Sequence, residues 1–343
     1  MDKIDTNKYS KFNPKHPFSP SVFVYGPNKE ILSTDGKTLY SVPNTIVDCK
    51  IPDGVENIYD GVFADCYNLK RIVFPSTIKI LGDDVFKNCS NLIVLNLPNS
   101  IQYFGPHFLR GSSVCYIRIL PTETNKNCNF YFHNNGLYSD KHELLAIMPT
   151  ARVFIIEPFV CSIREGVFQG MEYLNEIYFP KDGGEKTQSF FHEGMFKSCK
   201  NLSKIHNVQS VKNIPKETFA YCNLWELPQF EIIENIGDYA FYNSGLYFID
   251  LPNSLQNIGE HAFAYCKFKH ITIPSSVKNI GRWAFSYCLQ LTEAKLIGSD
   301  TKIGTVIFNE CCNLKNIILP QGFILPRYSL GYGLKHDCNI IRN

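Results

Sequence analysis

The sequence predicts an α/β repeat fold, a solenoid in which short coils of chain stack on one another. The first observation is a phenylalanine-centred motif, Ile-Gly-x-x-Ala-Phe, whose clearest copies end at Phe241, Phe263 and Phe285. A motif that recurs at a fixed spacing of this size is typical of solenoids, because each coil buries its apolar edge only against its neighbours. The second and third observations are a glycine column and a cysteine column in phase with that motif.

The motif defines an anchor column whose members lie 22 or 23 residues apart, except at two gaps of 59 and 28 residues. We expect the anchors and the cysteines to fill the coil interior, and the glycines to form tight corners that require a positive φ. The anchors are Phe63, Phe86, Leu109, Phe168, Phe196, Phe219, Phe241, Phe263, Phe285 and Phe308. The glycines, four residues earlier, are Gly82, Gly105, Gly237, Gly259, Gly281 and Gly304. The cysteines, three residues after the anchors, are Cys66, Cys89, Cys199, Cys222, Cys266, Cys288 and Cys311.

Each coil is also expected to contain one short strand. An apolar run that often ends in proline follows the cysteine column, as in residues 69–75. Alternation in this run turns Ile72 inward and Arg71 and Val73 outward, and the proline ends the strand because it has no N–H group. We therefore predict a parallel sheet on the concave face. The anchor motif is expected on a short helical or 3₁₀ turn on the convex face.

This pattern resembles the BspA-like leucine-rich repeats, also called the Treponema pallidum type. The matching motif is Leu-x-x-Ile-x-Ile-Pro-x-x-Val-x-x-Ile-Gly-x-x-Ala-Phe-x-x-Cys, and residues 268–288 follow it with Phe268 in the first position. Residues 35–43 resemble the family's usual lead-in to the first coil. Residues 135–149 resemble a second, divergent lead-in, which would explain the 59-residue gap. The resemblance covers residues 35–320 and implies a leucine-rich-repeat solenoid.

The predicted organisation has three parts. Residues 1–34 form an N-terminal segment or cap, residues 35–320 form the solenoid, and residues 321–343 form a C-terminal cap or tail. Irregular stretches are expected near 122–150 and 181–192, which contain the aromatic runs 130–132 and 190–191. Insertions in repeats often become loops that carry specificity. The alternative is that both stretches are divergent coils with buried aromatic residues.

Composition excludes several classes of function. The 343 residues include 34 basic and 32 acidic side chains and form no block of like charge, so a general nucleic-acid surface is not indicated. No apolar run approaches the length of a membrane span, and residues 1–20 lack the apolar core of a signal peptide. With 13 cysteines, seven of them in the repeat column, we expect buried free thiols in a reducing compartment.

Motifs for chemistry are absent from the sequence. It contains no Cys-x-x-Cys, no His-Glu-x-x-His and no glycine-rich phosphate loop. Cys266 has His261 and His270 nearby in sequence, but the repeat places these three side chains on different sides of the coil. The sequence therefore predicts a protein that is not an enzyme and that has no metal site or cofactor.

The outward residues of successive strands should form one continuous surface. Aromatic and charged residues are mixed along it, as they are at the energetic centres of protein interfaces. The alternative is that these are ordinary solvated strand positions. The candidate binding residues are Arg71, Asn96, Tyr116, Arg118, Glu176, Tyr178, Lys204, His206, Trp225, Phe248, His270 and Glu293.

These observations favour a non-enzymatic protein–protein interaction module. The family resemblance implies a surface-associated adhesion protein whose ligand is a matrix protein, a host protein or another cell-surface protein. The rival prediction is an intracellular scaffold that recruits a cytosolic partner, which the missing export signal favours. A third prediction is that the solenoid is a substrate-recruiting arm of a larger enzyme. The open ends of a solenoid would also allow copies to pair end to end.

Overall fold

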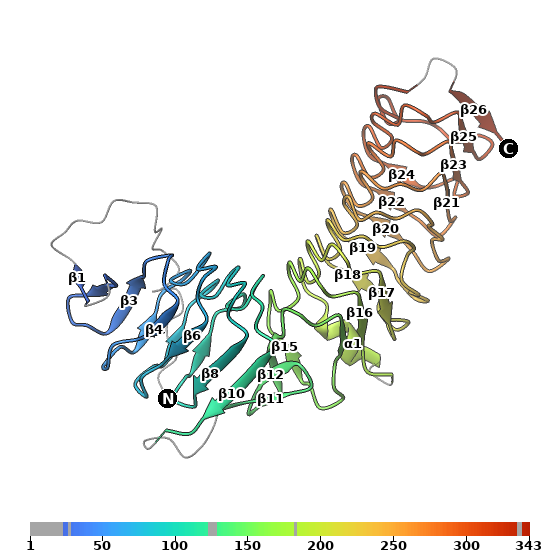
Figure 1. The fold of residues 1–343 in the computed structure, drawn as a ribbon. Coiled ribbons are helices and arrows are strands. Elements are labelled where there is room, and N and C mark those ends of the chain that lie inside the picture. Colours follow the sequence, from blue (N-terminus) through green and yellow to red (C-terminus); the bar gives the residue numbers. More distant parts are fainter. Residues whose placement is uncertain (1–22, 27–28, 123–128, 182–183, 335–337) are drawn as a thin grey trace.

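The computed structural model describes residues 23–26, 29–122, 129–181, 184–334 and 338–343. The chain forms a solenoid, as predicted, in which strands of successive coils pair in parallel. Figure 1 shows two arms that meet at an angle. We call residues 29–122 the N-terminal arm, 129–151 the joint and 152–334 the C-terminal arm.

One strand from most coils contributes to a long-strand row. The strands of this row pair in parallel, and equivalent positions of neighbouring coils lie side by side. Leu95, for example, pairs with Ile117. Two coils of the C-terminal arm have no regular strand in this row. They are joined there by an isolated parallel bridge between Glu226 and Phe248. The N-terminal strands of the row are β4 (Asp48–Lys50), β6 (Arg71–Val73), β8 (Val94–Pro98) and β10 (Tyr116–Leu120). The C-terminal strands are β14 (Val153–Ile155), β16 (Glu176–Tyr178), β17 (Lys204–His206), β21 (His270–Ile273), β23 (Glu293–Leu296), β25 (Asn316–Leu319) and β26 (Asn339–Arg342).

A second row consists of two-residue strands. In the C-terminal arm the isoleucine of each strand points into the core, and the neighbouring asparagine amides form a ladder. Asn235 Nδ2, for example, donates to Asn213 Oδ1 at 2.6 Å. The strands are β5 (Asn57–Ile58), β7 (Ile80–Leu81), β9 (Tyr103–Phe104), β18 (Asn213–Ile214), β19 (Asn235–Ile236), β20 (Asn257–Ile258), β22 (Asn279–Ile280) and β24 (Lys302–Ile303).

The anchor motif lies on tight turns, which agrees with the 3₁₀ form of the prediction and not with α-helical turns. Within a coil, the Ser244 N–H donates to the Phe241 carbonyl at 3.2 Å, which is the three-residue spacing of a tight turn. The Phe241 N–H instead donates to the Ala262 carbonyl of the next coil at 2.8 Å. This exchange between coils prevents a continuous helix. In the described residues, α1 (Gly184–Phe190) is the single α-helix, and it lies in the second predicted insertion.

The anchor phenylalanines form the centre of the core, as predicted. From Phe196 to Phe308, six rings stack with centroid distances between 5.1 and 5.7 Å. In the N-terminal arm only Phe63 and Phe86 stack in this way, at 5.5 Å, because Leu109 follows them in the column. Each arm has its own cluster of buried apolar residues, and the clusters meet in the joint.

The predicted reason for the glycine column is wrong. The column glycines do not have a positive φ. A Cβ on Gly259 would lie 2.6 Å from the Asp238 nitrogen, so glycine is required there because the backbone of the preceding coil is too close. The left-handed conformation belongs to the residues two before the anchor, such as His261 (53°) and Trp283 (54°).

The joint is an antiparallel meander inserted into the parallel solenoid. It consists of β11 (Phe130–His133), β12 (Gly136–Ser139) and β13 (Glu143–Ile147), and β13 then pairs in parallel with β15 (Ser162–Ile163). The N-terminus has the same plan. There, β1 (Phe23–Tyr25), β2 (Ile31–Ser33) and β3 (Thr38–Ser41) are antiparallel, and β3 pairs in parallel with β5. This topology agrees with a second lead-in at residues 135–149.

The meander also sets the direction of the bend. On the turn side the two arms touch directly, because His107 Nε2 lies 3.0 Å from Gln169 Oε1. Arg164 likewise donates to the Phe104 carbonyl at 2.7 Å. Figure 1 shows the turns bordering the inside of the bend and the meander on its outer side. At the joint the inserted meander separates the long-strand row into two parts, since β10 and β14 belong to different sheets.

Candidate protein-binding face

The strand face is the set of outward side chains on the long-strand row. Strand alternation creates it: in β6, Arg71 and Val73 are exposed and Ile72 between them is buried. The predicted register is confirmed here and in β10, where Tyr116 and Arg118 are exposed on either side of buried Ile117. Ten predicted residues lie on strands of this row, and Trp225 and Phe248 lie at the bridge.

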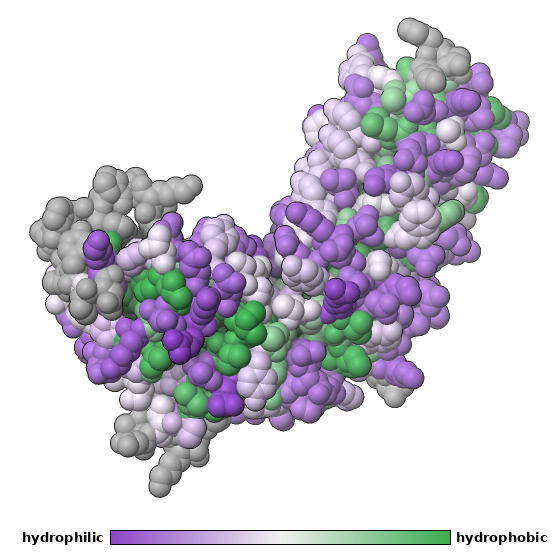
Figure 2. Space-filling model, in the orientation of Figure 1, coloured by the Kyte–Doolittle hydropathy of each residue, from purple (hydrophilic) through white to green (hydrophobic). Residues whose placement is uncertain are grey.

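In the N-terminal arm the strand face is more apolar than the predicted residues suggested. Val73, Val94 and Tyr116 have exposed fractions of 56%, 44% and 49%. Valines at outward positions of successive strands were the signal in the sequence, but the choice of charged and aromatic residues passed over them. Figure 2 shows apolar areas over the strands of this arm. We call Val73, Val94, Tyr116 and Leu120 the apolar strip.

Arg71 is already paired on this face. Its guanidinium group donates to both carboxylate oxygens of Asp48 on the neighbouring strand, at 2.7 and 3.2 Å. This hydrogen bond is the main reason that the pKa of Asp48 is lowered. The pair is exposed, so it shapes the charge pattern of the face more than it stabilises the fold.

A second group of predicted residues comes together across β16 and β17. The Tyr178 hydroxyl donates to Glu176 Oε2 at 3.0 Å, and the Tyr178 ring stacks on His206 at 4.0 Å. Lys204 Nζ lies 3.6 Å from Glu176 Oε1. The hydrogen bond from Tyr178, followed by the nearby Lys204 charge, lowers the pKa of Glu176. These four side chains therefore form one polar cluster whose charges largely balance.

Trp225 is exposed beside the strand face. Its indole stacks on Tyr247 with a centroid distance of 4.5 Å and meets the edge of Phe248 at 5.6 Å. Lys267 Nζ lies 5.5 Å from the centre of the Tyr247 ring. Trp225 is 54% exposed and Phe248 is 60% exposed. We call Trp225, Tyr247 and Phe248 the aromatic cluster.

Beyond Phe248 the strand face becomes polar. Predicted residues His270 and Glu293 occupy neighbouring positions on β21 and β23, and Asn316 follows on β25. Of the other predicted residues, Asn96 pairs in register with Arg118 near the apolar strip. The structure therefore does not bring all twelve residues into one patch. It separates them into the apolar strip with its neighbours, the Glu176 cluster, the aromatic cluster and a polar end.

A row of aromatic residues on the turn side was missed by the sequence analysis. Tyr221, Tyr242, Tyr265 and Tyr287 follow one another on successive coils with ring centroids 4.6 to 5.4 Å apart. Their recurrence just after the anchor column is visible in the sequence. A parallel stack of Tyr239, His261 and Trp283 runs beside them. The stacked rings stabilise the turns, and Tyr221, Tyr265 and Tyr287 remain 44%, 39% and 37% exposed.

The cysteine column has the structure that the sequence predicted, buried and without disulfides. Cys266 Sγ, for example, donates to the Phe241 carbonyl of the previous coil at 3.3 Å. Burial raises the pKa of the Cys266 thiol to about 12, so it is not a thiolate nucleophile at neutral pH. His261 is stacked between Tyr239 and Trp283 and does not activate it. Cys128 lies outside the described residues.

The two predicted insertions contribute their aromatic residues mainly to the core. Phe130 is buried in the joint, and Phe190 and Phe191 are buried beside Phe179 and Phe196. This outcome favours the divergent-coil alternative over exposed specificity loops. Phe190 is the last residue of α1 and packs into the core of the C-terminal arm.

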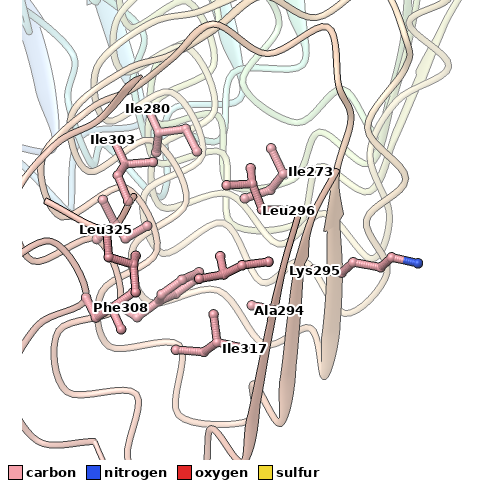
Figure 3. A pocket seen from close by; sticks show the side chains of 12 residues that line it. Ile273, Ile280, Ala294, Lys295, Leu296, Ile303, Phe308, Ile317 and Leu325 are labelled. Carbon is pink, nitrogen blue, oxygen red and sulfur yellow. The ribbon is translucent and has the colours of Figure 1, made fainter. Parts of the chain in front are cut away.

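Cavities and polar clusters do not form a small-molecule site in the part of the chain that is described. The apolar cavity in Figure 3 has a volume of about 20 Å³ and is lined by core residues such as Ile280, Leu296 and Phe308. The Lys295 ammonium group points away from it. A cavity of this size holds no ligand larger than a water molecule. Among the same residues, no group of three or more His, Cys, Asp or Glu side chains is placed to hold a metal ion.

A family model for the BspA type leucine rich repeat region matches residues 36–139, 151–236 and 234–329, in six copies. The chain belongs to the BspA-type leucine-rich repeat family. This match confirms the family predicted from the repeat motif, and it is a match to a repeat region and not to a catalytic family.

Three solved structures illustrate the likeness. A leucine-rich repeat protein from Bacteroides ovatus is 20% identical, with 95% of this chain and 79% of that chain covered and a TM-score of 0.41. The pneumococcal vaccine antigen PcpA is 18% identical, with coverages of 87% and 68% and a TM-score of 0.38. A leucine-rich repeat protein from T. pallidum is 18% identical, with coverages of 61% and 96% and a TM-score of 0.33. No curated protein matches. Within the described residues, no helix has the length and apolar character needed to cross a bilayer.

Proposed function

We propose that the strand face binds a protein ligand and that the chain is a non-enzymatic interaction module. The observation that carries this proposal is the apolar strip. About half of the surface of each of these residues is exposed to solvent: Val73, Val94 and Tyr116. Contiguous exposed apolar side chains on a soluble surface are typical of protein-interaction sites.

Two further features support the same face. The aromatic cluster adds two large exposed rings, and aromatic residues dominate the energetic centres of interfaces. The parallel hydrogen bonds between coils hold these side chains in fixed positions, so that little conformational entropy is lost on binding.

For the setting of this function, we propose adhesion at a cell surface, with a matrix, host or like cell-surface protein as ligand. This part rests on the family resemblance. The rival proposal, an intracellular scaffold, is supported by the column of free buried thiols, which reducing compartments maintain. Protease treatment of intact source cells separates the two. Release of peptides from this protein, with a cytosolic marker retained, supports adhesion, and protection until lysis supports the scaffold.

Binding itself is tested with the whole chain carrying Val73→Glu and Val94→Glu. We expect the double variant to fold normally and to lose binding to intact cells or to a cytosolic extract, because charges would have to be buried in the interface. The matched control is Asp53→Asn with Asp140→Asn, which changes two exposed side chains away from the strand face. Equal binding by the Val73/Val94 variant would refute a role for the apolar strip.

The solenoid end is a second contact surface that we propose, for pairing between copies. Strand β26 pairs with β25 on one side, and all four of its side chains are exposed. An unpaired strand edge can add a strand from another chain. Sedimentation of the whole chain, with and without Ile340→Lys, tests it: a concentration-dependent dimer that the variant abolishes is expected, and a wild-type monomer at all concentrations would contradict it.

A further inference from the structure

The aromatic cluster is flanked by two carboxylates, those of Glu226 and Asp250. Glu226 lies opposite Phe248 in the parallel bridge, where neighbouring strands are about 4.8 Å apart. Asp250 follows Phe248 by two residues, and both are exposed, with half-buried Ile249 between them. Neither carboxylate forms an ion pair or side-chain hydrogen bond with any described residue.

Two carboxylates elsewhere on the strand face, Asp48 and Glu176, have partners within the protein. Asp48 is bound by Arg71, and Glu176 is close to Lys204 and His206. The negative charge of those residues is therefore neutralised within the protein. The negative charges of Glu226 and Asp250 are not neutralised by any described residue. The surface around Trp225 and Phe248 therefore combines exposed rings with negative charge.

Among the described residues, the cationic side chains near the aromatic cluster do not pair with Glu226 or Asp250. Lys204, one coil earlier, lies 3.6 Å from Glu176, and Lys267 lies over the Tyr247 ring. Lys269 and His270 are exposed on the following coil and border the cluster on that side. The contact of Lys267 with Tyr247 shows that the cluster already binds one cation through a ring face.

The remaining open surface suits a guanidinium group. Indole is the aromatic group that attracts cations most strongly, and one side of Trp225 is covered by Tyr247 while more than half of the residue stays exposed. A guanidinium group is planar, stacks on rings and donates several hydrogen bonds in one plane. An ammonium group offers only a point charge, so we expect lysine to bind less well.

We propose that Trp225, Phe248, Glu226 and Asp250 form a docking position for an arginine side chain of the protein ligand. This inference rests on the proposed function and specifies the chemistry of the partner at one point of the strand face.

The protein contains only two tryptophans, which allows a direct test. In the whole chain with Trp283→Phe, Trp225 is the single reporter of indole fluorescence. The probe is a short capped peptide of serine and alanine with one central arginine. Its matched control carries citrulline, which has the same shape without the charge, and a third peptide carries lysine.

We expect the arginine peptide to change Trp225 fluorescence saturably and the citrulline peptide to bind about tenfold more weakly. The change should disappear in Glu226→Gln with Asp250→Asn and persist in Asp53→Asn with Asp140→Asn. Equal affinity for arginine and citrulline peptides would overturn the inference, as would a silent Trp225 or an effect that survives loss of both carboxylates. The apolar-strip variants test the proposed function separately, so that either idea can fail alone.

Discussion

The two arms share one backbone plan and differ in what they present to a partner. In the N-terminal arm the strand face carries exposed Val73, Val94 and Tyr116, whereas in the C-terminal arm beyond Phe248 it carries residues such as His270 and Glu293. The turn side shows the reverse: charged Arg110 pairs with Asp84 in the first arm, and a tyrosine row covers the second. Inward positions are fixed by packing, so the outward positions are where the two arms can differ.

The largest effect should come from emptying an anchor site. Phe263→Ala should lower the free energy of unfolding by about 3–5 kcal/mol. Phe86→Ala should cost less, because Phe263 stacks on two rings of its column and Phe86 on one. Urea denaturation of both variants measures the difference. A Phe263→Ala protein as stable as the wild type would contradict the stacked core of the C-terminal arm.

Glycine substitutions should affect both arms equally. An added Cβ at Gly105 would lie 2.4 Å from Asp83 N, and at Gly259 2.6 Å from Asp238 N. We expect Gly105→Ala and Gly259→Ala each to cost about 1–3 kcal/mol through overpacking.

Gly322→Ala is the control for these two variants, since nothing lies within 4 Å of its Cβ position and only its φ of +78° is unfavourable. It should cost about 1 kcal/mol. If all three variants lose the same free energy of unfolding, close approach between coils is not the reason that the column requires glycine.

The cysteine column should make stability depend on alkaline pH. Burial raises the pKa values of Cys89, Cys199 and Cys266 to about 12, whereas an unfolded thiol titrates near 8.5. The unfolded state therefore loses protons first, and the free energy of unfolding falls as pH rises from about 9 towards 12. Urea midpoints across this range measure the slope, which Cys266→Ala should reduce. A slope that is unchanged by this substitution would place the effect in other groups.

The smallest effect on stability should come from the strand face itself. Val94→Glu and Thr272→Glu replace outward residues in the two arms and should each change the free energy of unfolding by about 0.5 kcal/mol or less. Their effects on ligand binding should differ, with loss for Val94→Glu and retention for Thr272→Glu. Equal loss in both would mean that the ligand spans the whole face.

The periodicity of the sequence predicted the structural features that recur in every coil. Burial of Phe263 and Cys266 and exposure of Arg71 follow from local alternation and stacking between neighbours, so a repeating pattern reports them. The bend at the joint depends on antiparallel pairing of β11 to β13, which no repeat encodes. The role of Gly259 depends on how closely two coils approach. The apolar strip was missed because charged and aromatic residues were preferred as contact residues, although alternation already placed Val73 outward.

Site-specific photocrosslinking tests the central claim most directly. A photoreactive benzoylphenylalanine is placed at Val94 or Tyr116 on the strand face, or at Tyr265 or Tyr287 on the turn side, and the chain is irradiated with its source cells. We expect the same ligand to be crosslinked from both strand-face positions and from neither turn-side position. Crosslinks that form only from the tyrosine row would contradict the account and move the binding surface to the opposite side of the solenoid.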